Sequence, residues 1–113
     1  MSQLICTKTC GTCRKAVALL KEKGIKFEYR EYKKDPLSLE ELEELLELLG
    51  EPAHTLLRRR ETIYKELNVQ GNESNEILLP LFVQYPGLMQ RPIFVHEGAA
   101  VLCRPHDRLL ELL

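Results

Sequence analysis

The stretch Cys10-Gly11-Thr12-Cys13-Arg14 follows a short apolar run, Gln3-Leu4-Ile5-Cys6, and opens the amphipathic segment from Arg14 to Lys23. This order predicts a strand, a tight turn and a helix whose first residues are cysteines. Backbone N–H groups at a helix start have no intrahelical partner and favour an anion there. A cysteine in that position commonly has its pKa lowered from about 8.5 to about 3.5–7.5. We therefore expect Cys10 to react as a thiolate.

The residues after this start extend it into a strand–helix–strand unit. Gly24 stands where a residue just past the helix end is expected, and Phe27 to Tyr32 alternates apolar and polar residues as a half-buried strand does. A crossover helix of this length usually joins parallel strands. We therefore expect Leu4 to Cys6 and Phe27 to Tyr32 to pair in parallel.

The middle of the chain has a helical pattern. Ser38 and Glu41 fit a capping box, and the helix that they open ends at Gly50 and Pro52. Its apolar residues recur at helical spacing: Leu42, Leu45, Leu46 and Leu49. Two further helices are predicted, at Arg60 to Leu67 and Asn75 to Tyr85. Pro80 lies in the second, and we expect it either to delay the start of that helix or to kink it.

The last quarter of the chain predicts a β-hairpin and a short closing helix. Ile93 to Val95 and Ala100 to Cys103 flank a turn at Glu97-Gly98, and His106 to Leu112 follows as the helix. The order β-α-β, helical insert, β-β-α is that of an α/β thioredoxin-like (glutaredoxin-like) fold with a mixed four-stranded sheet. We expect one domain over residues 1–113, with the helical insert at approximately 37–90. A chain of 113 residues allows one core, whereas two independent domains would each be marginal.

Composition narrows the class of protein. The net charge of −1 gives no general reason to bind nucleic acid or a membrane surface. No apolar run reaches the eighteen or so residues that span a bilayer, and no signal peptide precedes Cys6. Hydrophobic residues at 44% and charged residues at 29% are globular values, so we exclude disorder. We therefore expect a cytoplasmic monomer in which four cysteines serve a redox or metal role.

Two metal-based interpretations compete with thiol chemistry. Cys6-x3-Cys10-x2-Cys13 has the spacing of a radical iron–sulfur motif, but that chemistry needs a much larger barrel around its nucleotide cofactor. The four cysteines could also hold a structural zinc ion, with Cys103 arriving from the hairpin. Two cysteines at a helix start suit thiol redox chemistry better, and a lone cysteine such as Cys103 is more often a small buried hydrophobe. We expect no metal ion and no bound cofactor.

Four short motifs are spread over nearly the whole chain. They are Thr9-Cys10-Gly11-Thr12-Cys13-Arg14, Leu56-Leu57-Arg58, Arg91-Pro92-Ile93 and Leu102-Cys103-Arg104-Pro105. In this order and at these separations, they resemble the motifs of the arsenate reductase family, which includes the Spx-type redox regulators. The resemblance implies a thioredoxin-like fold and a thiol-dependent reduction of arsenate or a similar oxyanion.

The resemblance also implies roles for single residues. It assigns the nucleophile to Cys10 and a cis peptide bond, facing that cysteine, to Pro92. Arginine suits an oxyanion site because its guanidinium is planar, bidentate and always charged. The oxyanion site would combine three arginines with the backbone N–H groups at the helix start: Arg58, Arg91, Arg104, Gly11 and Thr12.

Two positions depart from the glutathione-dependent reductases. Cys13 stands where those enzymes usually have serine, and Cys6 where they often have histidine. Cys13 offers an internal resolving thiol, so two routes stay open. Either a Cys10–Cys13 disulfide forms and a thioredoxin-like partner reduces it, or glutathione and a glutaredoxin supply the electrons.

The Spx-type regulators supply the alternative function. They share the Cys-x-x-Cys followed by Arg-Lys-Ala, which matches Cys13 to Ala16, and use it as a redox switch on RNA polymerase. Such a protein would bind the C-terminal domain of the polymerase α-subunit. These regulators lack the Leu-Cys-Arg-Pro segment around Arg104. Retention of all three arginines therefore favours an oxyanion-reducing enzyme.

Overall fold

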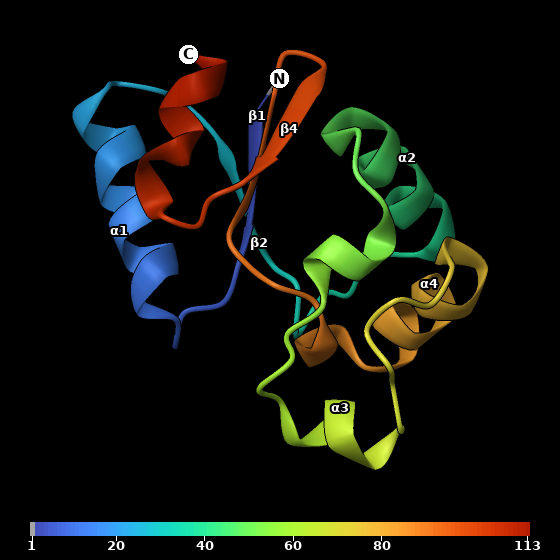
Figure 1. Ribbon diagram of the computed structural model, residues 1–113. Coiled ribbons are helices and arrows are strands. Elements are labelled where there is room, and N and C mark those ends of the chain that lie inside the picture. Colours follow the sequence, from blue (N-terminus) through green and yellow to red (C-terminus); the bar gives the residue numbers. More distant parts are fainter. Residues whose placement is uncertain (1) are drawn as a thin grey trace. The chain divides into compact units, whose positions relative to one another are not determined.

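The computed structural model describes residues 2–113, which form two compact units (Figure 1). The first unit combines the segment that ends at Asp35 with Arg91–Leu113, and the second spans Pro36–Gln90. The second unit thus covers the segment expected to be a helical insert, at approximately 37–90. The expectation of a single domain over 1–113 stays a prediction.

The first unit contains a mixed sheet of four strands. They are β1 (Ser2–Cys6), β2 (Glu28–Glu31), β3 (Ile93–His96) and β4 (Ala99–Leu102), in the order β2-β1-β3-β4. β1 pairs in parallel with β2, and the pairs β1–β3 and β3–β4 are antiparallel. The two ends of the chain therefore build one sheet, and the thioredoxin-like topology predicted from the element order is confirmed.

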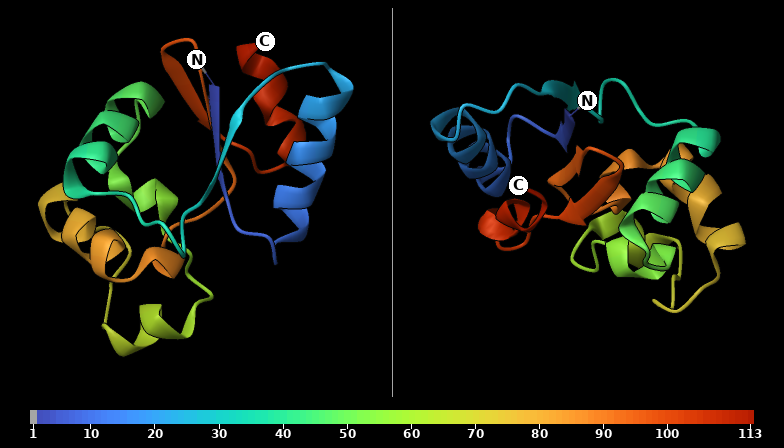
Figure 2. Two further views of the ribbon diagram at one scale, coloured as in Figure 1. Left: turned by 180° about the vertical axis from the view of Figure 1, so that it is seen from behind. Right: turned by 90° about the horizontal axis from the view of Figure 1, so that it is seen from above.

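Two helices cover one face of this sheet. α1 (Gly11–Glu22) and the 3-10 helix η3 (His106–Leu112) lie side by side there (Figures 1 and 2). α1 begins directly after Cys10, and Gly11 to Cys13 form its first turn, so the prediction of a helix that starts at the cysteines is confirmed. The core between helices and sheet consists of buried side chains from β1, β3, β4, the two helices and the residues beside them: Leu4, Cys6, Cys10, Cys13, Ala16, Leu20, Phe94, Val101, Cys103 and Leu109.

The hairpin has the turn that its sequence predicts. Glu97 and Gly98, the two residues between β3 and β4, have φ values of 48° and 80°. Positive φ at both central residues gives the backbone twist that a two-residue hairpin loop needs. This hairpin directs the chain into the segment that carries Arg104, directly after β4.

The second unit is helical. Its elements are α2 (Leu39–Leu49), the 3-10 helices η1 (Ala53–Leu56) and η2 (Pro86–Leu88), α3 (Thr62–Glu66) and α4 (Asn75–Gln84), and α2 packs against α4. The capping box of Ser38 and Glu41 is present. α4 begins at Asn75 and contains Pro80 in its interior, so the alternative of a delayed start is wrong. Within residues 2–113, none of the helices has the length and apolarity needed to cross a membrane.

Candidate active site

Cys10 lies at the start of α1, as the sequence predicts. It is the N-cap residue, with an extended backbone (φ −89°, ψ 121°), and its own N–H donates to the Thr7 carbonyl at 3.2 Å. Gly11 and Thr12 follow as the first two helical residues, whose N–H groups have no acceptor within an α-helix. The Cys10 side chain is 8% exposed. Its thiol therefore lies at the edge of the core, beside the helix start.

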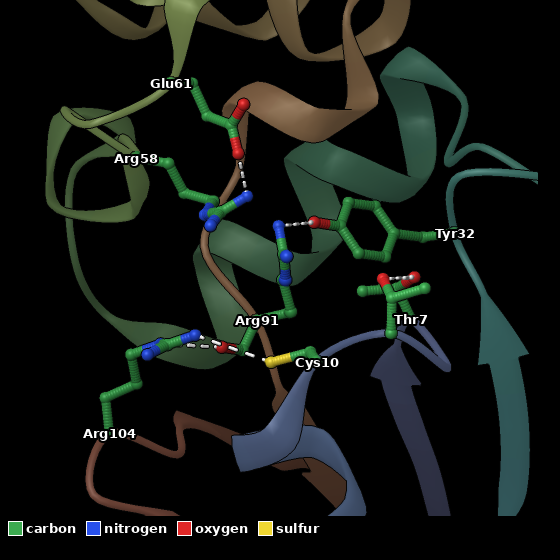
Figure 3. Close-up of polar contacts among 8 residues, drawn as sticks. Thr7, Cys10, Tyr32, Arg58, Glu61, Arg91 and Arg104 are labelled. Carbon is green, nitrogen blue, oxygen red and sulfur yellow. Dashed lines mark hydrogen bonds and ion pairs between the residues drawn. The ribbon is translucent and has the colours of Figure 1, made fainter.

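Arg104 reaches the Cys10 sulfur from the segment after β4. Its Nη2 donates to Cys10 Sγ at 3.6 Å, and its Nε donates to the Arg91 carbonyl at 2.8 Å (Figure 3). The bond to the carbonyl orients the guanidinium, so that a positive charge is held next to the sulfur. A cation in that position favours a thiolate over a thiol.

Arg91 is a buried cation near the same sulfur. It is 6% exposed and donates from Nη1 to the Tyr32 hydroxyl at 3.4 Å (Figure 3). Burial opposes the charge of Arg91, but Tyr32 and Cys10 outweigh it and raise the pKa of the guanidinium. The Arg91–Pro92 peptide bond is cis, the configuration that the family resemblance implied, and Arg104–Pro105 is cis as well.

One donor of Arg91 has no acceptor. Among residues 2–113, the buried Arg91 Nε finds no hydrogen-bond partner. Leaving a buried donor unsatisfied costs about 1–3 kcal/mol, and more for a charged group. An oxyanion accepts several hydrogen bonds at once and would satisfy this atom. The donor set around Cys10 therefore fits an anionic ligand.

Arg58 belongs to the second unit. Its N–H donates to the Leu88 carbonyl at 2.8 Å, and its Nη1 forms an ion pair with Glu61 (Figure 3). Arg59 and Arg60 are exposed, and Arg59 donates a hydrogen bond to the Gly71 carbonyl at 2.9 Å. The oxyanion contact expected of Arg58 stays a prediction.

Cys13 lies deeper than Cys10, with 1% of its side chain exposed. Its sulfur accepts a hydrogen bond from the Thr7 N–H at 3.5 Å and one from the neighbouring Cys6 thiol. The hydrogen bond from Cys6 contributes most, and together with the other donors and the Arg91 charge it outweighs burial and lowers the pKa of Cys13 to about 7. The thiolate form of Cys13 is therefore favoured in spite of burial.

Sequence reasoning did not identify three residues that the structure places in this site. Thr7 follows β1, Cys6 ends it, and Tyr32 follows β2. The carboxyl ends of parallel strands meet at one edge of a sheet, and the Tyr32 N–H donates to the Cys6 carbonyl at 3.1 Å. The two strands were predicted to be parallel, so Thr7 and Tyr32, which follow their carboxyl ends, could have been predicted to lie near each other.

Cys103 has the structural character expected of it. It is fully buried, and its thiol donates to the Val101 carbonyl at 3.6 Å. Burial raises the pKa of Cys103 to about 12, so it remains a neutral thiol at physiological pH. Over the described part of the chain, no three His, Cys, Asp or Glu side chains are gathered so that they could hold a metal ion.

Comparison with protein families gives one matching family over most of the chain. The model of the ArsC family matches residues 6–112. An uncharacterized protein of Escherichia coli, YfgD, is 39% identical over 106 residues, which is 92% of this chain and 89% of that protein. An arsenate reductase of Neisseria meningitidis serogroup B is 34% identical, with 92% and 91% of the two chains covered.

Two further similarities bear on the choice between an enzyme and a regulator. The global transcriptional regulator Spx of Enterococcus faecalis is 34% identical, over 86% of this chain and 74% of that one. The solved structure of an arsenate reductase from Vibrio cholerae has a TM-score of 0.93 and 32% identity, and covers 99% of this chain and 97% of that one. The reductases of Neisseria meningitidis and Vibrio cholerae are thus matched over nearly their whole length. An arsenate reductase of Rhizobium meliloti, 33% identical, extends beyond the matched region as the regulator does, because only 75% of it is covered.

Proposed function

This chain belongs to the ArsC family, and on that premise we propose that it reduces arsenate, or a related oxyanion, through an adduct on Cys10. Similarity to proteins named arsenate reductase, over nearly their whole length, supports a thiol-dependent oxidoreductase. We also propose a cytoplasmic location, because the proposed reaction starts from reduced cysteines, which a reducing compartment maintains.

The observation that carries this proposal is the Arg104 donor on Cys10 Sγ together with the neighbouring buried Arg91, whose Nε has no hydrogen-bond partner among the described residues. A protein that needed only a buried thiol would gain nothing from two guanidinium groups at its sulfur. A tetrahedral oxyanion placed there would neutralise both charges and accept the free N–H. It would also stand within reach of the nucleophile.

The first chemical step forms a sulfur–arsenic bond. The Cys10 thiolate attacks the arsenic atom of a bound arsenate, and a hydroxide leaves as water after it takes up a proton. The arginines that bind the oxyanion also favour the thiolate, so that substrate binding and activation of the nucleophile use the same charges. The N–H groups of Gly11 and Thr12 add donors at the helix start. We also assign an oxyanion contact to Arg58.

The second step transfers two electrons. The Cys13 thiolate attacks Cys10 Sγ, the new S–S bond forms, and the S–As bond breaks with its electron pair on arsenic. Arsenic(V) thus becomes arsenic(III), which leaves as arsenite. A thiol donor, either glutathione with a glutaredoxin or a thioredoxin-like protein, then reduces the Cys10–Cys13 disulfide by the same exchange chemistry.

A single-turnover experiment tests this function. Reduced protein without an external thiol is mixed with arsenate, and arsenite and the remaining free thiols are quantified. We expect about one equivalent of arsenite per chain and the loss of two thiols, mapped to Cys10 and Cys13 by mass spectrometry. Cys10→Ser should release none, whereas Cys13→Ser should stall unless glutathione supplies the second thiol. Absence of arsenite from the wild type would refute the assignment.

The similarity to Spx supports a second candidate function. The Cys-x-x-Cys of Cys10 and Cys13 could act as a redox switch on a transcription regulator that binds RNA polymerase. Such a switch would oxidise with diamide or peroxide but show no arsenate-dependent loss of thiols. It would also retain the isolated C-terminal domain of the polymerase α-subunit in a pull-down. Clear retention of that domain together with no arsenite would favour this alternative over the enzyme.

A further inference from the structure

Cys6 is a third thiol at the site, and neither step of the proposed function uses it. It is the last residue of β1 and is fully buried, directly before Thr7. The Cys6 thiol and the Thr7 N–H both donate to Cys13 Sγ, the backbone donor from 3.5 Å. Two consecutive residues of one strand end therefore present their donors to the same sulfur.

The other titratable and charged groups around Cys13 come from every neighbouring segment. Cys10 shares the helix start, Arg91 contributes a positive charge, and Cys103 lies in the same core as a neutral thiol. Lys8, Arg14 and Tyr29 line a cavity of about 350 Å³ together with Cys13. The carboxylate of Glu31 lies beside this set, since it raises the pKa of Tyr29 and accepts a hydrogen bond from the Lys8 N–H at 2.8 Å.

Donors are needed here because burial penalises an ionised group. A thiolate with 1% exposure cannot be stabilised by bulk water, so its charge depends on protein hydrogen bonds. The opposite pKa shifts of Cys6 and Cys13 agree with Cys6 as the donor and Cys13 as the acceptor. Interaction with Cys13 and burial raise the pKa of Cys6, so Cys6 keeps its proton and remains a donor while Cys13 loses its own.

We propose that Cys6 is a positioning residue that, together with the Thr7 N–H, holds the Cys13 sulfur as an anion ready to attack an adduct on Cys10. The inference rests on the proposed function only in taking Cys13 as the resolving thiol. In the step, Cys13 S⁻ attacks Cys10 Sγ, the bond from Cys10 to its adduct breaks, and the electron pair leaves with the displaced group. Cys6 retains its proton throughout and forms no covalent bond.

A chromogenic disulfide tests this without arsenate. One equivalent of dithiobis(nitrobenzoate) is mixed with the reduced full-length protein. A first thionitrobenzoate is released when Cys10 forms a mixed disulfide, and a second when Cys13 attacks it. The rate of the second release, followed from pH 5 to 10, should have a midpoint near pH 7, the pKa of Cys13. Mass spectrometry should then find Cys10 joined to Cys13.

Three variants of the donor separate hydrogen bonding from packing. Cys6→Ala and Cys6→Val remove the donor, and we expect the midpoint to rise by about one pH unit, the effect of losing one hydrogen bond to a charged group. Below pH 7 the second release should slow about threefold to fivefold, while its high-pH plateau rises, because a more basic thiolate is a better nucleophile. Cys6→Ser keeps a donor and should hold the midpoint within a few tenths of a unit.

Cys103→Ala is the matched control, because it removes a buried thiol whose S–H is directed to the Val101 carbonyl. In this variant, the pH midpoint of the second thionitrobenzoate release should equal that of the wild type. An unchanged midpoint in both Cys6→Ala and Cys6→Val would overturn the proposal, as would a second release that persists in Cys13→Ser and joins Cys10 to Cys6. Because no arsenic is present, these outcomes are independent of whether the protein reduces arsenate.

Discussion

At the scale of single residues, Arg91 and Arg104 act on the same sulfur but are held in different ways. Arg91 is buried and bonded to Tyr32, whereas Arg104 is exposed and is oriented by one bond to the Arg91 carbonyl. Removing Arg91 leaves a buried phenol without this donor, but removing Arg104 leaves no hole in the core. The two substitutions should therefore differ in stability even where they agree in anion binding.

The first prediction concerns these arginines. Arg91→Ala and Arg104→Ala should each weaken the binding of arsenate or sulfate by about ten- to a hundredfold, because each removes a charged donor worth about 1.5–3 kcal/mol. Arg91→Ala should also lower the free energy of unfolding by about 1–3 kcal/mol, and Arg104→Ala should lower it little. Calorimetric titration and urea denaturation measure the two effects.

Arg60→Ala is the control for this experiment, since Arg60 is exposed and should affect neither quantity. The same titration with Arg58→Ala tests the oxyanion contact assigned to Arg58. Equal and small losses of affinity in all four variants would show that the arginines do not form an anion site.

At the scale of elements, the three longest helices begin in different ways. Ser38 accepts a hydrogen bond from the Glu41 N–H at the start of α2, whereas Ser74 forms no side-chain cap at the start of α4. α1 begins at Cys10, which also forms no side-chain cap. Its first N–H groups are thus not used by a capping side chain, which suits a helix start that serves a site.

The second prediction uses the two serines as a matched pair. Ser38→Ala should lower the free energy of unfolding by about 1 kcal/mol, because it removes both the capping acceptor and the partner in the capping box. Ser74→Ala should change it by less than about 0.5 kcal/mol, since no cap is lost. Urea denaturation of both variants measures the difference, and equal losses would contradict the capping argument.

At the scale of the whole molecule, the buried ionisable groups shift in opposite directions. Hydrogen bonds lower the pKa of Cys13 to about 7, whereas burial raises the pKa of Cys103 and of Tyr29 to about 12. The pKa of Cys6 is raised as well. An unfolded cysteine ionises near pH 9, so folding releases a proton from Cys13 at neutral pH and retains protons on the others at alkaline pH.

The third prediction is that stability passes through a maximum near pH 9. Between pH 7 and 9 the unfolded chain binds the proton of Cys13 more strongly than the folded chain does, so stability rises with pH. Between pH 9 and 12 the folded chain retains the protons of Cys6 and Cys103, so stability falls with pH. Each fully shifted group contributes a slope of about 1.4 kcal/mol per pH unit.

Urea denaturation in the presence of a phosphine reductant measures this profile. Cys13→Ser should abolish the rise between pH 7 and 9, and Cys103→Ala should reduce the slope above pH 9 by about 1.4 kcal/mol per unit. A profile that falls continuously from pH 7, or a Cys103→Ala profile with the wild-type slope, would contradict the assigned shifts.

The sequence by itself determined the local features. The capping box of Ser38 and Glu41, the turn at Glu97-Gly98 and the placing of Cys10 at a helix start each depend on residues within about four positions of one another. Propensity and hydrogen bonding act directly over that range, so a pattern in the sequence specifies the geometry. The four family motifs also allowed the fold class to be predicted from the sequence, because their order along the chain matches the order of the strands and helices.

Only the tertiary structure decided which groups surround the thiols. Arg104 meets Cys10 across 94 positions of sequence, and Arg91 meets Tyr32 across 59. The donors of Cys6 and Thr7 lie close to Cys13 in sequence, but they reach its sulfur only because β1 ends against the first turn of α1. Such contacts depend on strand pairing and burial rather than on local propensity. The lowered pKa of Cys13 is therefore a property of the assembled sheet and helix, and no pattern in the sequence expressed it.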